Sequence, residues 1–360
     1  MKVSIVFGTR PEIIKTASVI KEFDRLALDY FIVHTGQHYS YNMDKVFLEE
    51  LKLRDPKYHL GIGSGSHGQQ TGKMLIAIEK VLRKEKPNVV LVQGDTNSTL
   101  SGALSATKLA IKVGHVEAGL RSYDRKMPEE INRVLTDHCS NFLFAPTETS
   151  KEILLREGIS EEKVFVTGNT IVDVVYQNME LAKKQDLLNK LHLRSKQYFL
   201  VTIHRQENVD DKTRFSRIIE GLKRISDEFG TPIIYPVHPR SIKRMKEFNL
   251  HPKGIKIVNP TNFANFLQLE YHARLVLTDS GGVQEETCIL KVPCVTLRDN
   301  TERPETLHVG SNILAGTNPR KMVECVKVTL KKDNNWDNPF GDGEAGKKIA
   351  DILINRVQKN

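Results

Sequence analysis

Short apolar runs alternate with amphipathic segments along nearly the whole chain. The runs are rich in Val, Ile and Leu and predict strands at 3–7, 30–34, 89–93, 114–116, 142–145, 163–166, 199–203, 233–237, 255–258, 275–278 and 294–297. Helical spacing of apolar residues predicts helices at 12–26, 72–84, 96–111, 215–229, 319–330 and 346–357. Strands that lack in/out alternation and are separated by helices are typical of parallel sheets covered on both faces. We therefore predict an α/β fold.

The strand signal stops over residues 171–195, which are polar and follow a helical pattern. A second series of strands and helices begins after this stretch. At roughly 100–200 residues per domain, 360 residues fit two domains. We expect an N-terminal Rossmann-like domain at 1–170, a helical connection at 171–195 and a C-terminal Rossmann-like domain at 196–345.

Charge and cysteine content narrow the class of protein. The 53 basic and 44 acidic side chains leave a net charge of +9 that is spread along the chain, whereas nucleic-acid binding requires a concentrated patch. The four cysteines show neither paired spacing nor a histidine at zinc-site spacing, so we expect reduced thiols in a cytoplasmic protein (Cys139, Cys288, Cys294 and Cys325). No apolar run approaches the length of about 18 residues that predicts a membrane span.

No cofactor or metal motif is convincing. The glycine pattern at 63–68 matches a dinucleotide-binding fingerprint in its letters, but a full strand does not precede it, and we interpret it as a loop. We therefore expect no cofactor and no metal site.

Candidate reactive groups follow the predicted strands of the first half, where ligands of parallel sheets bind. Arg10 follows strand 3–7, with Lys15 about one helical turn further, although both could be solvated surface charges. Asp95 follows strand 89–93 and could serve only as a helix N-cap. Glu117 follows strand 114–116, and Glu129 stands at a predicted helix start. We expect the three carboxylates to share one crevice, where mutual repulsion would favour a general base.

The second half offers groups suited to a diphosphate. His204 follows strand 199–203, and Arg303 follows strand 294–297. Residues 280–282 (Ser-Gly-Gly) open a helix after strand 275–278 and can present backbone N–H groups to phosphates, although a structural turn would also explain them. An acidic residue in the next turn can bind ribose hydroxyls. Two domains facing a cleft, one with carboxylates and one with a diphosphate site, indicate nucleotide-sugar chemistry.

Seven motifs in a fixed order carry a family resemblance. They are GTRPE (8–12, with Lys15), QGD (93–95), HVEAGLR (115–121), PEEINR (128–133), HRQEN (204–208), TDSGGVQEE (278–286) and TERPE (301–305). Together they resemble the non-hydrolysing UDP-N-acetylglucosamine 2-epimerases. The resemblance implies a glycosyltransferase B type fold, two doubly wound domains facing a central cleft, with the helix at 346–360 returning to the first domain.

The same resemblance implies the reaction and its residues. The family interconverts UDP-GlcNAc and UDP-ManNAc by eliminating UDP to 2-acetamidoglucal and adding it back, without a cofactor and usually as a homodimer. Its product would supply cell-surface or protein-linked glycans. The matching catalytic positions are Asp95, Glu117, Glu129 and His204, and spacing leaves open which carboxylate removes the proton. The matching substrate positions are Arg10, Lys15, Thr261, Phe266, Ser280, Gly281, Gly282, Glu286 and Arg303.

One region departs from the family pattern. Bacterial relatives have a second UDP-GlcNAc site, and two of its expected polar or cationic contacts are altered here, in the segment QHYSY (37–41) and at the residue before Gln70. Gln37, Gln69 and Arg205 are the candidate residues for such an allosteric site. The alternatives for the whole chain are a hydrolysing 2-epimerase that releases ManNAc and UDP, a transferase on the same fold, and an inactive nucleotide-sugar sensor.

Overall fold

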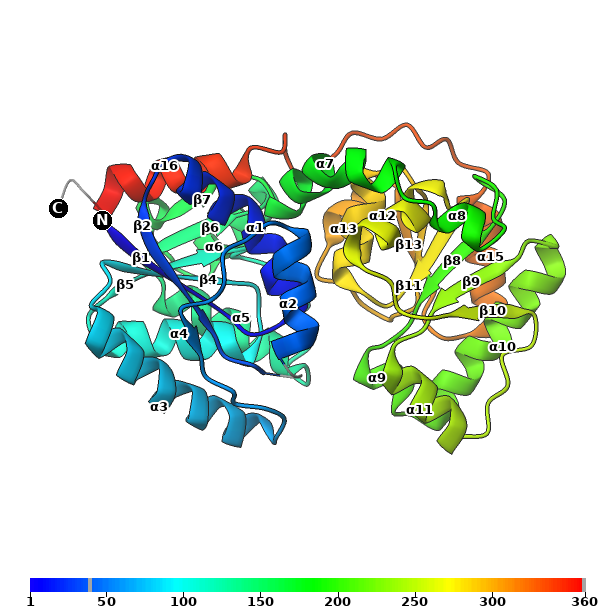
Figure 1. The fold of residues 1–360 in the computed structure, drawn as a ribbon. Helices are drawn as coiled ribbons and strands as arrows, with labels where there is room; N and C mark the ends of the chain where they lie inside the picture. The colour runs from blue at the N-terminus through cyan, green and yellow to red at the C-terminus, as the bar shows by residue number, and fades with distance from the viewer. Residues whose placement is uncertain (38–40, 358–360) are drawn as a thin grey trace. The chain divides into compact units, whose positions relative to one another are not determined.

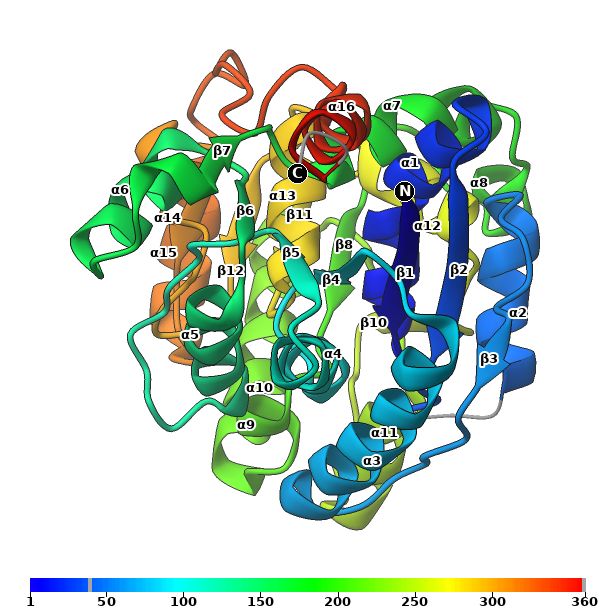
Figure 2. The same ribbon diagram turned by 90° about the vertical axis from the view of Figure 1, so that its left-hand side faces the viewer.

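The computed structural model describes residues 1–37 and 41–357, which form two compact units. The first unit comprises Met1–Val174 and Phe340–Asn360, and the second comprises Val175–Pro339. Each unit contains one parallel β-sheet with helices packed against it (Figures 1 and 2).

The described part of the first unit contains a seven-stranded sheet in the order β3-β2-β1-β4-β5-β6-β7. All its paired strands are parallel. The strands are β1 (Lys2–Phe7), β2 (Asp29–His34), β3 (Tyr58–His59), β4 (Val89–Gln93), β5 (Lys112–Val116), β6 (Phe142–Ala145) and β7 (Val164–Val166). The helices are α1 (Arg10–Arg25), α2 (Tyr41–Glu50), α3 (His67–Glu85), α4 (Asn97–Lys108), α5 (Pro128–Cys139), α6 (Glu148–Arg156), the start of α7 (Thr170–Lys183) and α16 (Ala345–Val357), with a 3₁₀ turn at Glu161–Lys163.

The second unit contains a six-stranded parallel sheet in the order β10-β9-β8-β11-β12-β13. Its strands are β8 (Phe199–Thr202), β9 (Ile233–Pro236), β10 (Ile255–Val258), β11 (Leu275–Thr278), β12 (Cys294–Thr296) and β13 (Asn312–Leu314). Its helices, after the end of α7, are α8 (Leu187–Lys190), α9 (Gln206–Val209), α10 (Lys212–Phe229), α11 (Pro239–Glu247), α12 (Phe263–His272), α13 (Gly281–Ile289), α14 (Pro304–His308) and α15 (Pro319–Thr329).

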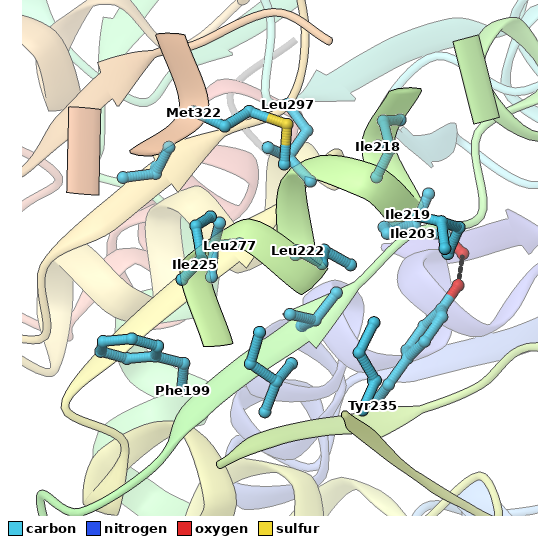
Figure 3. Packing of buried hydrophobic residues seen from close by; sticks show 14 of the residues in the cluster. Phe199, Ile203, Ile218, Ile219, Leu222, Ile225, Tyr235, Leu277, Leu297 and Met322 are labelled. Atoms are coloured by element: carbon cyan, nitrogen blue, oxygen red, sulfur yellow. Dashed lines mark hydrogen bonds between the residues drawn. The ribbon is translucent and has the colours of Figure 1, made fainter. Parts of the chain in front are cut away.

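The core of the second unit lies between its sheet and α10. Leu222 on α10 is fully buried in the same cluster as Phe199 on β8 and Leu277 on β11 (Figure 3). The hydroxyl of Tyr235 donates a 2.7 Å hydrogen bond to the carbonyl of Ile203, which satisfies the one polar atom of that buried ring (Figure 3). The cluster holds the carboxyl ends of β8 and β11 in place.

Helix α16 completes the first unit by packing along α1 (Figure 1). Asp173 on α7 accepts hydrogen bonds from the backbone N–H groups of Ala345 (3.2 Å) and Gly346 (2.8 Å). Burial raises the pKa of the Asp173 carboxyl. A Cβ at Gly346 would lie 2.8 Å from backbone atoms of Ser18 on α1, so only glycine allows this approach.

All eleven predicted strands are present, and the elements that sequence reasoning missed are mostly short. Strand β3 has two residues and β13 has three, which is too short for a hydrophobic pattern to be distinctive. The prediction also missed α2, α6, α9, α11, α12 and α14. The missed strands lie at sheet edges, so the strand order around the central positions is unaffected.

Candidate active site

Both sheets contain a point at which the strand order reverses. It lies between β1 and β4 in the first sheet and between β8 and β11 in the second. Ligands of doubly wound folds bind at the carboxyl ends of the strands at such a point. The candidates Arg10, Asp95 and Glu117 follow β1, β4 and the adjacent β5, and His204 and Ser280 follow β8 and β11.

Glu117 is a tightly held carboxylate of the first unit. It is 7 % exposed, and its Oε2 accepts hydrogen bonds from Lys15 Nζ on α1 and Gln93 Nε2 on β4, both at 2.6 Å. Its φ of +72° lies in the left-handed region, which non-glycine residues rarely adopt. Such strain persists where the surrounding structure fixes a residue, and it clusters at functional sites.

Asp95 follows β4 and forms an ion pair with Arg133 on α5. The Asn132 amide of the same helix donates a 3.0 Å hydrogen bond to the Asp95 carbonyl. Helix α4 is capped by Thr96, whose Oγ1 accepts from the backbone N–H of Thr99 at 3.2 Å. The alternative that Asp95 serves only as an N-cap is therefore wrong.

The adjacent glutamates at the start of α5 have different surroundings. Glu130 is buried and accepts 2.9 Å hydrogen bonds from the backbone N–H groups of Ser122 and Tyr123. It also pairs with Arg133 Nη1 at 2.5 Å. Glu129 is half-buried and lies one residue after Pro128, in the first turn. Glu130 therefore closes the loop before α5, which leaves Glu129 as the candidate for chemistry.

Two candidate carboxylates of the first unit, Glu117 and Asp95, are paired with cations. Glu117 pairs with Lys15, and Asp95 shares the buried guanidinium of Arg133 with Glu130. The sequence led us to expect repulsion between the carboxylates, but these cations offset that repulsion. Ion pairs across neighbouring elements are what fixes the acidic groups.

Arg10 begins α1. Its guanidinium carbon lies 4.4 Å from the centroid of the Phe47 ring on α2, a cation–π contact. This contact places the cation at the carboxyl end of β1, beside the N-terminus of α1.

Glu12 is the last residue of the GTRPE motif, and the sequence predicts no function for it. Its buried carboxylate accepts four hydrogen bonds, from Gly8 N (3.0 Å), Thr9 Oγ1 (2.8 Å), Thr96 Oγ1 (2.7 Å) and Thr99 Oγ1 (3.0 Å). Burial raises the pKa of this carboxyl, against the effect of the four donors. Glu12 thereby joins the loop after β1 to the loop after β4.

Two candidate residues for a second nucleotide-sugar site, Gln37 and Gln69, differ in burial and in hydrogen bonding. Gln37 is buried, and its Oε1 accepts from Ser98 N (3.2 Å) and Ser98 Oγ (2.8 Å). Gln69 is exposed near the start of α3, whereas the adjacent Gln70 donates to the carbonyls of Gln37 and Gly63 at 2.8 Å. Residues 38–40 lie outside the described part of the chain. Gln37 therefore has a structural function in the first unit.

In the second unit, residues 280–282 form the N-terminus of α13. Ser280 is the N-cap, and Gly281 and Gly282 are the first two helical residues. A Cβ at Gly281 would lie 2.7 Å from Glu302 Oε1, so the close approach of that side chain requires glycine. Glu286 lies one turn further and is 8 % exposed. A helix start of this kind directs backbone N–H groups towards an anion.

Arg303 lies beside the start of α13 and is already engaged with carboxylates. Its Nε lies 2.5 Å from Glu285 Oε1, and its Nη1 lies 3.4 Å from Glu302 Oε1. Arg205, the third candidate for the second nucleotide-sugar site, donates to the same Glu302 oxygen at 3.1 Å. The sequence did not reveal that this predicted diphosphate cation is ion-paired within its own unit.

His204 is positioned through its backbone. The N–H groups of His204 and Arg205 each donate 3.1 Å hydrogen bonds to the buried carboxylate of Asp279, the residue after β11. The His204 side chain is 44 % exposed, its Nδ1 lies 3.4 Å from Asp279 Oδ1, and its ring lies 6.0 Å from that of His238. Asp279 thus joins the loops after β8 and β11.

The two candidates for uracil binding lie on either side of the start of α12. Thr261 precedes the helix and Phe266 lies within its first turns, both half-buried. The Oγ1 atom of Thr261 is buried and has no hydrogen-bond partner within the described residues.

Sequence reasoning missed the residues that hold the candidate groups. Gln93, Arg133 and Asp279 lie within three of the seven motifs, each within four residues of a candidate residue, and this closeness in sequence was the signal for them. His115 on β5 forms a fully buried pair with Asp137 on α5, at 2.6 Å between Nδ1 and Oδ1. No spacing rule connects these two residues, because only the packing of α5 on the sheet brings them together.

The described residues contain no group of three or more His, Cys, Asp or Glu placed to bind a metal ion. Within the same residues, no helix combines the length and the apolarity that crossing a bilayer requires.

Comparison with known proteins adds independent evidence. A sequence profile describing UDP-N-acetylglucosamine 2-epimerase matches residues 21–354. The UDP-N-acetylglucosamine 2-epimerase of Methanocaldococcus jannaschii is 59 % identical over 98 % of this chain and 99 % of its own. That of Methanococcus maripaludis is 56 % identical over 98 % of both chains. The crystal structure of the Methanocaldococcus jannaschii protein in complex with UDP-GlcNAc and UDP superposes with a TM-score of 0.94, covering 99 % of this chain and 100 % of that one.

These similarities and the two parallel sheets establish the fold class. Both units are doubly wound α/β domains, and the chain has the glycosyltransferase B type fold of these structural relatives. The α/β fold predicted from the apolar pattern is confirmed.

Proposed function

The chain belongs to the UDP-N-acetylglucosamine 2-epimerase family, and from this premise we propose that it interconverts UDP-GlcNAc and UDP-ManNAc. As a member of that family it is an isomerase. The substrate is supported by the relative of known structure, which binds UDP-GlcNAc and UDP.

The proposed reaction inverts C2 of the sugar without a redox cofactor. The C2 proton is not acidic enough for simple removal, so its loss accompanies cleavage of the C1–oxygen bond to UDP. The electron pair of the C2–H bond forms the C1–C2 double bond of 2-acetamidoglucal, and the phosphate oxygen keeps the pair of the broken bond. UDP then adds back to C1 while C2 receives a proton on the opposite face. This chemistry requires a base, an acid and a stabilised leaving group.

The observation that carries the proposal is the buried Glu117, fixed by Lys15 and Gln93 with its backbone in the left-handed region. We assign proton transfer at C2 to this residue together with Asp95 and Glu129. The ion pair of Asp95 with Arg133 on α5, the helix that also carries Glu129, supports this assignment. Substitution of Glu117 and of Asp95 tests which carboxylate removes the proton and which returns it.

We assign UDP binding to the second unit. The N-terminus of α13 suits the diphosphate because its backbone N–H groups and its dipole favour anions. Glu286 would bind the ribose hydroxyls, and the Phe266 ring and Thr261 would contact the uracil. The remaining proposed contacts with the sugar and phosphates are Arg10, Lys15, His204 and Arg303.

Incubation of the wild type with UDP-GlcNAc in D₂O tests the reaction. We expect deuterium at C2 of both intact UDP-sugars, because the abstracted proton exchanges with solvent. Absence of exchange during interconversion would overturn the elimination. Accumulation of free ManNAc with UDP would indicate a hydrolysing epimerase, and turnover only with an added acceptor would indicate a transferase. The same incubation is repeated with Glu117→Gln and with Asp95→Asn. Deuterium exchange at C2 without net inversion in one of these variants separates the two proton transfers.

We also propose that the protein is a cytoplasmic homodimer whose product supplies glycan assembly. The four cysteines are free thiols, as expected for a reducing compartment. Ile131 and Leu135 lie four residues apart on α5, and therefore on one face of it, and are 40 % and 46 % exposed, so that two neighbouring apolar side chains are available for an interface. Light scattering tests the dimer, and Ile131→Lys should weaken it.

A further inference from the structure

The buried pair of His115 and Asp137 contacts several segments of the candidate site. His115 on β5 is fully buried. Its Nδ1 lies 2.6 Å from Asp137 Oδ1, and its Nε2 lies 2.8 Å from the carbonyl oxygen of Gly94. Neither residue is a proposed catalytic group.

The hydrogen bonds define where the protons of His115 are. A carbonyl oxygen only accepts, so Nε2 must carry a hydrogen to bond Gly94. Burial opposes the charge of Asp137, yet His115 and Arg121 together hold its pKa below the ordinary value. The ionised carboxylate also only accepts, so Nδ1 carries a hydrogen as well. A ring with two N–H groups is an imidazolium.

The pair reaches all three segments that carry the candidate carboxylates. His115 Nε2 holds Gly94, the residue before Asp95, while the ring itself stands two residues before Glu117. Asp137 Oδ2 accepts a 3.2 Å hydrogen bond from the N–H of Gly119, two residues after Glu117. Asp137 also lies on α5, about two turns after Glu129.

We propose that His115 is a positioning residue, an imidazolium that with Asp137 sets the relative positions of Asp95, Glu117 and Glu129 for proton transfer at C2. This inference rests on the proposed function. A neutral ring could donate only one of the two hydrogen bonds, so it would release either the loop of Asp95 or the helix of Glu129.

Other charges around the pair keep it ionised. Arg121, from the segment after β5, lies 2.7 Å from Asp137 Oδ2, and its Nη2 lies 2.6 Å from Glu157 at the end of α6. Arg133, one turn before Asp137 on α5, directs its charge to Asp95 and Glu130 instead. Two cations thus meet two anions in and beside the core, and removing any one leaves a buried charge uncompensated.

Nitrogen NMR of the wild type labelled with ¹⁵N-histidine tests the protonation directly. We expect one histidine, absent from the spectrum of His115→Gln, to show two protonated ring nitrogens. One bare and one protonated nitrogen at that residue would overturn the proposal. The measurement needs no turnover, so it separates failure of this inference from failure of the proposed function, which is measured by the D₂O experiment.

Steady-state kinetics tests the positioning. We expect His115→Gln to lower kcat by about 10- to 100-fold, the scale of a small misplacement of reacting groups. The KM for UDP-GlcNAc and the affinity for UDP should change by less than about threefold, because no binding group is altered. His251→Gln, an exposed histidine of the second unit, is the matched control and should have wild-type rates. A raised KM with unchanged kcat would contradict the proposal.

Asp137→Asn adds a readout that a purely structural role would not change. The asparagine keeps an acceptor for Nδ1 but removes the charge that favours the imidazolium. The fall of kcat with rising pH should therefore move to lower pH in Asp137→Asn. A pH profile that superimposes on that of the wild type would contradict the proposal. If this variant does not fold, the wild-type NMR result still decides.

Discussion

At the carboxyl ends of the first sheet, acidic side chains are the candidate reactive groups and cations hold them in place. Lys15 holds Glu117, and Arg133 holds Asp95. At the carboxyl ends of the second sheet the arrangement is reversed. There Arg303 and Arg205 are the candidate ligand groups, and Glu302 holds both of them.

The reversal indicates how each unit contributes to the reaction. A carboxylate fixed by an ion pair keeps its geometry while protons move, which suits acid–base catalysis. Cations that are already paired neutralise little further charge, so binding of a diphosphate in the second unit depends more on the backbone N–H groups of α13. Substitutions in the first unit should therefore change turnover, and substitutions at α13 should change UDP affinity.

The largest effect expected is that of Glu117→Gln. The amide keeps the shape of the side chain but cannot accept a proton, so kcat should fall by about 10²- to 10⁴-fold. The Kd for UDP, measured by calorimetry, should stay within about threefold of the wild type. Glu148→Gln, an exposed glutamate in the first turn of α6, is the control. A turnover rate close to that of the wild type would show that Glu117 is not catalytic, and it would contradict the assignment of turnover to the first unit.

Substitution of one ion-paired aspartate in each unit compares how much a buried and a partly exposed ion pair contribute to the free energy of unfolding. Asp137 is fully buried between His115 and Arg121, whereas the side chain of Asp210 in the second unit is 30 % exposed beside Arg240 and Arg244. Asp137→Asn removes the carboxylate that His115 and Arg121 share and should lower the free energy of unfolding by about 3–5 kcal/mol. Asp210→Asn, whose ion pairs are screened by solvent, should cost about 0–1 kcal/mol. Urea unfolding at pH 7 measures both, and equal losses would contradict the difference in burial.

The pH dependence of these losses has a defined sign. Burial opposes the charge at both residues, but the cations hold the pKa of each carboxyl below its ordinary value of about 3.9. Each carboxylate therefore contributes stability above about pH 4, and the contribution is lost as pH falls through the lowered pKa of the folded state. The stability difference between wild type and Asp137→Asn should shrink on acidification from pH 5 towards pH 3. A difference that grows on acidification would be incompatible with the lowered pKa.

Gly8→Ala tests the packing behind the carboxylates of the first unit. A Cβ at Gly8 would lie 1.9 Å from Thr35 Oγ1 and 2.3 Å from Ser98 Oγ, so the loop after β1 must shift. We expect a loss of about 1–3 kcal/mol in unfolding free energy. Gly72→Ala within α3 is the control, because a Cβ there meets no atom of the described residues within 4 Å and should stabilise by up to about 1 kcal/mol. Equal stabilities of the two variants would show that the loop tolerates displacement.

A small effect on UDP binding is expected for Gly281→Ala. The new Cβ would displace Glu302 and approach the guanidinium of Arg303, at 3.5 Å from its central carbon. The Kd for UDP should rise about tenfold, or about 1.4 kcal/mol, while kcat at saturating substrate stays within about threefold. Isothermal calorimetry and steady-state rates measure the two quantities. A lower kcat with unchanged UDP affinity would assign a catalytic function to the second unit and overturn the division proposed here.

The sequence predicts the sheets well because their strands are buried on both faces. A run such as that of β1 has no polar alternation and cannot be mistaken for a surface segment. The edge strands β3 and β13 were not predicted because they bury too few side chains to produce a distinctive apolar run. Helix boundaries depend on caps, and Thr96 rather than Asp95 caps α4 because its hydroxyl reaches the N–H of Thr99.

Candidate site residues were found where a rule ties sequence to position, namely directly after a strand. Glu117 and Asp95 are of this kind. The residues that hold them are not, since the Asp137 carboxylate reaches His115 across 22 residues of chain. Only the family resemblance separated Glu129 from Glu130, because the physical difference lies in which of them turns towards the backbone of Ser122. Burial and ion pairing of Arg303 likewise depend on tertiary contacts.

Helix α16 has a consequence for synthesis of the chain. The face of α1 that packs on α16 is made near the start of translation, but α16 is made near the end. The whole second unit is translated in between. At about 5–20 residues per second, the ribosome needs roughly 10–35 seconds to pass from Val174 to the end of α16. Throughout that interval the nascent first unit presents an apolar helix face that chaperones can bind.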